Sequence, residues 1–216
     1  MTKFILGTKQ NMVQFFDEKG RSIPATFLSV NPTVVTQIKT KEKDGYSAVQ
    51  FGFGKRNEKN INKAQKGHCK VATEIIGESS ELGNFASFKE LRLKEGEPKE
   101  KVGDIVDVTV FVVGDNVQVS AISKSKGFQG VVKRHGFHGG FRSHGQKHSE
   151  REPGSFGATG PQRVFKGTRM GGRMGGDRIC VKNLKVLGVD VENNKILISG
   201  AVPGRRGTFV EIKGDD

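Results

Sequence analysis

The sequence predicts a mainly-β fold: a small β-barrel that carries a small insertion and one long, basic, glycine-rich extension. Short apolar or β-branched runs recur along most of the 216 residues, about ten residues apart, with turn-forming residues between them. One segment, residues 124–178, breaks this pattern. It holds fourteen of the thirty glycines and few aliphatic residues, so it cannot bury enough apolar surface to offset its own ordering entropy.

The first half of the chain is predicted to form short strands. The turn signals Asp17-Glu18-Lys19-Gly20 and Asn31-Pro32 separate several of them. Residues 57–66 are polar with helical propensity, so we expect a short exposed helix or an ordered loop within an insertion at about 55–85. Residues 95–101 are expected to form a charged turn. The strand candidates are residues 4–6, 12–16, 25–30, 33–36, 45–53 and 85–93.

The second half contains the remaining strands. Residues 105–113 and 116–122 are predicted to pair as a hairpin, with Gly114-Asp115 at the turn. Strands at 179–189, 195–199 and 208–212 follow the extension, and Asn193-Asn194 is predicted to make a tight turn between the first two. The predicted organisation is a barrel core from 1–123 and 179–213, the extension at 124–178, and a short acidic tail at 214–216.

The extension carries most of the chain's charge. It contains twelve Lys or Arg and three acidic residues, which is about +9 of the net +13. Strands flank it on both sides, so it is a loop within a folded domain that needs a polyanion to order it. RNA is the predicted partner, because a loop of this length, at ~3.3–3.6 Å for each residue, can reach the interior of a large RNA. A membrane partner is disfavoured, since the chain has no basic amphipathic helix.

Motifs for catalysis, metals or nucleotides are weak. Gly167 and Gly172 have the glycine spacing of a P-loop, but Arg173 and Met174 follow where Lys and Ser or Thr are needed. The i, i+4 pair His144 and His148 has no completing Cys or carboxylate, and its glycine-rich surroundings disfavour a helix. We therefore expect a non-enzyme with no catalytic residue, metal, cofactor or small-molecule substrate.

The two cysteines suggest a reducing compartment. Cys69 and Cys180 stand far apart and in no CxxC pattern, so both are expected to be reduced thiols. The first ten residues do not have the pattern of a signal peptide, and no stretch approaches the length of apolar sequence that spans a membrane. The expected location is the cytoplasm.

The side chains of the extension suit contacts with RNA. Lys and Arg neutralise phosphates, glycine allows close backbone approach, and His and Phe rings can stack on unpaired bases. Phe137, Phe141 and Phe156 are candidates for stacking, whereas Phe128 and Phe165 are expected to pin the base of the extension onto the barrel. The predicted RNA-binding residues are Lys124, Lys126, Lys133, Arg134, His135, Arg142, His144, Lys147, Arg151, Arg163, Lys166, Arg169, Arg173 and Arg178.

Several motifs, in order along the chain, resemble one known family. They are DGYSAVQFGFG (44–54), NKAQKGHCKVA (62–72), SKSKGFQGVVKRHGF (123–137), PGSFG (153–157), VFKGTRMGGRMGGDR (164–178) and GAVPG (200–204). They resemble the bacterial-type large-subunit ribosomal protein L3 family, and the resemblance runs from about residue 3 to 213.

The resemblance implies a six-stranded barrel of the type shared with translation elongation factors. It implies a structural protein that binds large-subunit rRNA early in assembly, with the barrel near the subunit surface. The extension would reach toward the peptidyl transferase centre, with its tip at about 136–160, and neighbouring ribosomal proteins, including L14, would be partners. The location it implies is the ribosome in the cytoplasm.

The chain departs from the family's pattern at two positions. Ser125 stands where the family usually has Gly. Ala158 follows Gly157, where many members carry a Gln that can be methylated, and Gln162 is a poor substitute. The modification is therefore not carried over to this chain.

Two alternative functions stay open at the level of the residues. The first is an RNA-modifying enzyme with a basic guiding loop, which would need a cofactor loop or an acid–base pair. The second is a free RNA chaperone. Deletion of the extension separates the chaperone from a ribosomal protein, because only the latter should then fail in subunit assembly. We expect the extension to be disordered away from RNA.

Overall fold

The computed structural model describes residues 3–77, 84–93, 98 and 100–214. The chain forms two compact units, one of Met1–Ile122 with Ile179–Asp216 and one of Ser123–Arg178. The predicted mainly-β class is confirmed, since most elements are strands. The predicted acidic tail 214–216 and charged turn 95–101 lie largely outside the described residues.

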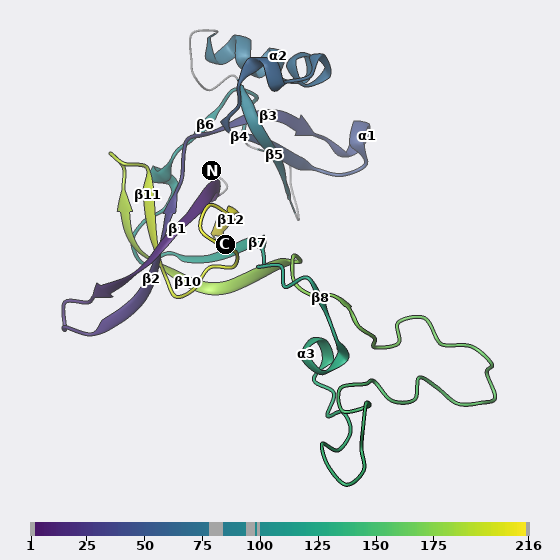
Figure 1. The fold of residues 1–216 in the computed structure, drawn as a ribbon. Coiled ribbons are helices and arrows are strands. Elements are labelled where there is room, and N and C mark those ends of the chain that lie inside the picture. Colours follow the sequence, from purple (N-terminus) through teal and green to yellow (C-terminus); the bar gives the residue numbers. More distant parts are fainter. Residues whose placement is uncertain (1–2, 78–83, 94–97, 99, 215–216) are drawn as a thin grey trace. The chain divides into compact units, whose positions relative to one another are not determined.

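The first unit contains a sheet of six antiparallel strands that closes on itself, because β2 pairs with both β11 and β1 (Figure 1). The closed order is β1 (Phe4–Phe16), β12 (Phe209–Gly214), β7 (Asn116–Ile122), β10 (Arg178–Asp190), β11 (Lys195–Ser199) and β2 (Ser22–Ser29).

Alternating side chains fill the interior of this barrel. Successive residues of a strand point to opposite faces, so Ile196 and Ile198 of β11 and Val210 and Ile212 of β12 face the same core. Ile5 of β1 joins them, and all five are fully buried. Burial alternates along β12, whereas on β11 the intervening Leu197 is buried as well.

A second sheet packs on the outside of β1. It has the order β5 (Phe85–Arg92), β4 (Ala48–Lys55), β3 (Thr33–Lys39) and β6 (Ile105–Val106), with the short helix α1 (Lys41–Asp44) between β3 and β4.

Strand β1 therefore serves two cores. Ile5 faces the barrel, whereas Phe4 and Leu6 on either side of it pack into a cluster with the second sheet. The ring of Phe4 lies 5.0 Å from that of Phe51 on β4, in a tilted arrangement. The alternation along one strand thus joins the two sheets.

Helix α2 (Lys63–Ile76) covers the second sheet (Figure 1). It follows a 3-10 helix, η1 (Glu58–Asn60), and buries Cys69 and Ala72 in a small cluster with Val34 and Phe85 of the sheet. Residues 57–66, expected to form a short exposed helix or an ordered loop, contain η1 and the start of α2. The continuation of α2 to Ile76 was not predicted, because it depends on burial of Cys69 and Ala72, and Gly67 weakened the helical signal.

A polar network links α2 to the second sheet. Lys39 Nζ lies 2.7 Å from Glu90 Oε1 and donates to the Tyr46 hydroxyl at 2.8 Å, and Tyr46 donates to Glu90 Oε2 at 2.9 Å. Gln50 donates to Glu90 Oε1 at 3.3 Å, and Gln50 Oε1 lies 2.6 Å from Nε2 of His68 on α2. The hydrogen bond from Lys39 holds the pKa of Glu90 below its usual value, and the same bond raises that of Lys39.

The hairpin predicted between 105–113 and 116–122 is wrong. Only Ile105–Val106 is a strand, and it pairs with β3, while β7 pairs with β12. A 3-10 helix at Val108–Val110 follows, and Val108 and Phe111 are buried in the barrel core. Burial along this run alternates between exposed Ile105, Asp107 and Thr109 and buried Val106 and Val108, as it would in a strand, so the sequence pattern alone indicated one.

Two predicted strand ends are also wrong. Residues 4–6 and 12–16 form one strand, β1, whose pairing with β2 shifts register between Lys9 and Met12. The polar residues at this shift made one strand look like two.

The turn predicted at Asn193-Asn194 is longer than expected. Asp190 and Lys195 are the last pair between β10 and β11, so the loop spans residues 191–194. Asp190 Oδ1 accepts a hydrogen bond from the Asn193 backbone at 3.0 Å, which favours the longer turn.

Phe51→Ala should lower the free energy of unfolding by about 3–5 kcal/mol, because the substitution leaves a cavity between the second sheet and β1. Phe16→Ala is the matched control; its ring is exposed near the end of β1, and the change should stay within about 0.5 kcal/mol. Urea denaturation followed by circular dichroism measures both. Equal losses would contradict the packing described.

Glu90→Gln should lower the urea midpoint at neutral pH, and the deficit should shrink in acid. A carboxyl whose pKa is lowered by folding stabilises the protein above its ordinary pKa of 4.5, and this contribution is lost as the pH falls through the lowered value. Urea titrations of wild type and variant between neutral pH and about pH 3 measure the difference between their midpoints. Glu42→Gln, at an exposed position, is the control. If the difference in midpoint between Glu90→Gln and wild type did not change with pH, the network would be contradicted.

Candidate nucleic-acid interface

The unit Ser123–Arg178 begins and ends in an antiparallel stem. Its two arms pair through β8 (Phe128–Gln129) and β9 (Gly172–Arg173). The pairing continues beyond these strands, since the Lys126 amide donates to the Met174 carbonyl at 2.9 Å and the Met174 amide donates to the Gly127 carbonyl at 3.0 Å. Backbone hydrogen bonds therefore hold the two arms together without a hydrophobic core.

The second arm of the stem, which contains β9 and is called the return arm, requires glycine at one position. Gly175 has φ +73°, and a Cβ there would collide with the Lys124 carbonyl of the other arm. The adjacent Gly176 amide donates to Ser123 Oγ at 3.1 Å, and the Ser123 amide donates to the Asp177 carbonyl at 2.9 Å. At this point glycine serves the close approach of two protein backbones.

Helix α3 (Val131–His135) is fastened to the return arm. It ends at Gly136, which is left-handed with φ +73°. Arg134 Nη1 donates to the Met170 carbonyl at 2.7 Å, and His135 Nε2 lies 3.0 Å from the same oxygen. Both residues belong to the set predicted to bind RNA; they are half-buried, and one nitrogen of each contacts the Met170 carbonyl.

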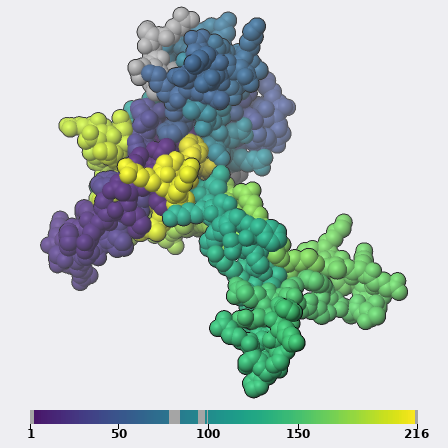
Figure 2. Space-filling model, in the orientation of Figure 1, coloured from purple at the N-terminus to yellow at the C-terminus, as the bar shows by residue number. Residues whose placement is uncertain are grey.

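Beyond α3 the chain forms two successive loops (Figure 1 and Figure 2). The first is closed where the Gly140 amide donates to the Glu150 carbonyl at 2.9 Å, and the Arg142 guanidinium pairs with the Glu150 carboxylate at 3.0 Å. The second runs from about residue 151 to 170. The segment 136–160, expected to be the tip, contains the whole first loop and the beginning of the second.

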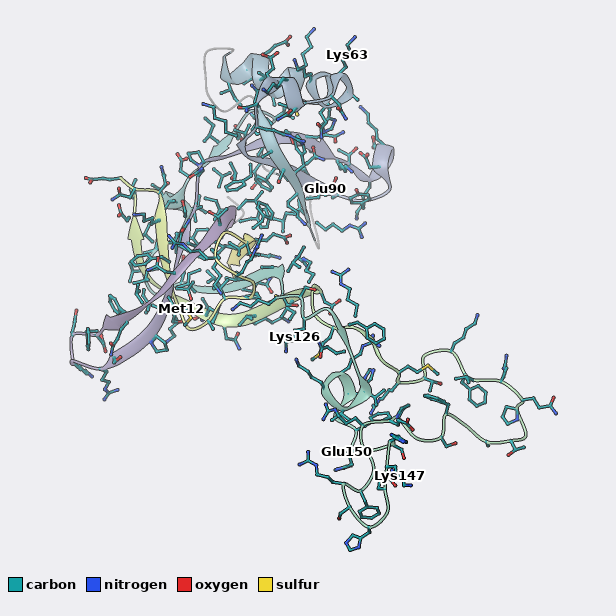
Figure 3. The ribbon with its side chains drawn as sticks, viewed as in Figure 1. Met12, Lys63, Glu90, Lys126, Lys147 and Glu150 are labelled. Carbon is teal, nitrogen blue, oxygen red and sulfur yellow. The ribbon has the colours of Figure 1, made fainter. Side chains whose placement is uncertain are left out.

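The predicted RNA-binding side chains are exposed along both the stem and the loops. Figure 3 marks Lys126 on the stem and Lys147 on the first loop. Apart from the half-buried Arg134 and His135, every residue of the predicted set is exposed. Nine of these cations have no acidic partner within 4 Å in the part of the chain that the structure describes: Lys124, Lys126, Lys133, Lys147, Arg151, Arg163, Lys166, Arg169 and Arg173.

Aromatic rings accompany these cations. Phe128 and Phe141 are each 79% exposed, and Phe165 is 54% exposed with the Arg163 guanidinium 5.7 Å from its ring centre. Within Ser123–Arg178 the rings of Phe128 and Phe165 are exposed, because the glycine-rich arms provide no apolar surface to cover them. Exposed rings beside cations are suited to stacking on bases.

A hollow of about 510 Å³ lies between the end of α3 and the two loops. The rings of His135 and Phe137, 6.1 Å apart, line it together with Gln146, Glu152 and Arg169. Ring faces for stacking and polar groups for hydrogen bonds meet there, as recognition of an unpaired base requires.

The described residues provide no metal centre, because they contain no cluster of three or more His, Cys, Asp or Glu that could hold an ion. His144 has φ +62° and stands in a turn, so the spacing of His144 and His148 does not place them on a helix. Cys69 is buried and Cys180 is exposed, and both are free thiols. Within the described chain, no helix is long and apolar enough to cross a membrane.

Sequence reasoning missed a second concentration of positive charge, at residues 55–70 in the first unit. The signal was present in the sequence as a run of six Lys or Arg with one acidic residue. It was overlooked because the more glycine-rich segment 124–178 carries the larger charge.

Comparison with known proteins gives a consistent result. A family model described as "Ribosomal protein L3" matches residues 59–194. The proteins named "Large ribosomal subunit protein uL3" from Bacillus thuringiensis (strain Al Hakam), Bacillus mycoides (strain KBAB4) and Bacillus cereus (strain B4264) are each 46% identical to this chain over 214 residues. Each alignment covers 99% of this chain and 97% of the relative.

Gly175→Ala should open the stem. The left-handed backbone costs a non-glycine residue about 1–2 kcal/mol, and the collision with the Lys124 carbonyl adds to this. The amides of Lys126 and Met174 should then exchange with solvent faster in hydrogen-exchange NMR. Gly160→Ala is the control, because a Cβ there meets nothing within 4 Å. Unchanged exchange in Gly175→Ala would contradict the stem.

Proposed function

Because the chain belongs to the ribosomal protein L3 family, we propose that Ser123–Arg178 is the segment through which it binds and organises large-subunit rRNA. As a family member the chain is a structural constituent of the large ribosomal subunit and acts in translation, within the ribosome in the cytoplasm. The protein is not an enzyme, so the alternative of an RNA-modifying enzyme is set aside.

One observation carries this proposal: nine exposed cations of the extension have no acidic partner among the described residues. A protein of this size ordinarily disperses its charges or pairs them, and a cluster of unpaired cations is electrostatically costly unless an anion is present. RNA phosphates supply that anion, and contacts from roughly eight cations would give a slope of log K against log salt of about −6 to −7.

The finer details of the proposal rest on the resemblance of motifs. We propose that the closed six-stranded sheet is a barrel of the type found in translation factors, and its strand order supports this. The extension would bind early in assembly and reach toward the peptidyl transferase centre, with L14 as a neighbouring protein. The length of the extension and its lack of a core support a role inside RNA, because such a segment needs a partner along most of its surface.

Removing charge from the two loops should weaken RNA binding without unfolding the barrel. The variant Lys147→Gln, Arg151→Gln, Arg163→Gln, Arg169→Gln should make the salt slope for large-subunit rRNA shallower by about 3–4, because four phosphate contacts are lost. Its co-sedimentation with large subunits in high salt should fall.

The matched control is the variant Lys19→Gln, Arg21→Gln, Lys41→Gln, Lys43→Gln, which removes four exposed cations of the first unit that also have no acidic partner among described residues. It should retain the wild-type slope. Equal slopes for all three proteins would contradict the proposal. A loop variant that binds RNA weakly yet assembles normally into subunits would favour a free RNA chaperone.

A further inference from the structure

Building on the proposed rRNA binding, we infer that the first unit has an RNA-contact surface of its own, formed by residues 55–70 on η1 and α2. These sixteen residues contain six Lys or Arg and one acidic residue, a net charge of about +5. The whole chain outside 124–178 has 24 Lys or Arg and 20 acidic residues, a net charge of +4. The positive charge of the first unit is therefore concentrated on this one surface.

The helix presents its lysines as a stripe. Lys63, Lys66 and Lys70 follow i, i+3, i+7 spacing, so they lie on one face of α2, and they span about 10 Å along its axis. All three are exposed, and Figure 3 shows Lys63 on α2. Cys69 and Ala72 hold the neighbouring face against the sheet, which fixes the stripe toward solvent.

Among the described residues, three lysines of this surface have a weak acidic partner or none: Lys59, Lys63 and Lys70. Within the described chain no carboxylate lies within 4 Å of Lys59 or Lys63. Lys70 is 3.7 Å from Glu74, but its side chain is 72% exposed, and an exposed pair of this kind contributes little. Lys66, by contrast, has a close partner, Glu58 at 2.6 Å. At the two ends of the stripe, Lys63 and Lys70 are therefore available to an external anion.

The start of α2 is compatible with an anion beside the lysine stripe. The helix has 14 residues; its N-cap, Asn62, makes no side-chain capping bond, and its first turn has no acidic residue. The first backbone N–H groups of a helix have no partner within it and lie at the positive end of its dipole. Without a cap or a carboxylate, they are available to a phosphate.

A groove of about 280 Å³ adjoins the stripe. Ile61 and the rings of Phe85 and Phe88 line it. Lys66 and Lys70 line it too, together with their acidic partners Glu58 and Glu74. The two rings meet edge to face at 5.9 Å. Cations beside an apolar, aromatic groove are suited to a single-stranded segment whose phosphates meet the lysines and whose base enters the groove. An RNA strand also matches the net charge of this surface better than an ordinary protein segment.

Charge removal tests this surface in the full-length protein. The variant Lys59→Gln, Lys63→Gln, Lys70→Gln should make the salt slope for large-subunit rRNA shallower by about 2–3, since three phosphate contacts are lost. The matched control Lys19→Gln, Arg21→Gln, Lys43→Gln removes the same charge elsewhere in the unit and should keep the wild-type slope. An unchanged slope in the first variant, or an equal change in both, overturns the inference.

The four-site loop variant in the same assay separates this inference from the proposed function. If only the α2 variant fails to change the slope, the second surface is absent while the extension still binds RNA. If only the loop variant fails, the proposed role of the extension is wrong.

Cross-linking in the particle identifies what the surface touches. A photoreactive residue placed at Lys63 in assembled large subunits should cross-link to rRNA. Cross-linking to a neighbouring protein, or no cross-link, overturns the inference.

Discussion

Repulsion among the cations of Ser123–Arg178 opposes any compact form of that segment, and its composition offers no core to resist the repulsion. In the structure, only the base of this segment is held together. Backbone hydrogen bonds pair the two arms, and Gly175 allows them to approach closely. Further out, Arg134 and His135 bind one carbonyl, of Met170, while the remaining charge stays exposed. The segment is thus anchored by the protein and left for an anion to complete.

The first unit, by contrast, is stabilised by buried hydrophobic side chains. It has a barrel core and a second sheet, and β1 connects them because Ile5 faces one and Phe4 and Leu6 face the other. Helix α2 is held on the second sheet by burial of Cys69 and by the polar chain that ends at His68. A firmly packed unit can position charged surfaces without using them for its own stability.

The sequence was most informative where one physical signal dominated. Short apolar runs identified the strands β11 and β12, and composition identified the basic segment 124–178. Prediction failed where structure depends on distant partners. Val108 and Phe111 fill the barrel core, but their apolar run resembles a strand. The hydrogen bond from Arg134 to the carbonyl of Met170, 36 residues later, was not predicted, because nothing local in the sequence indicates it.

Hydrogen exchange, measured on the free protein and on the protein within large subunits, tests the central claim most directly. If RNA completes the extension, amides of residues 136–170 exchange rapidly in the free protein and slowly in the subunit, whereas those of β11 and β12 are protected in both. The barrel strands serve as the internal reference. Equal exchange of residues 136–170 in both states would contradict the account, because it would mean that the extension neither needs nor meets RNA.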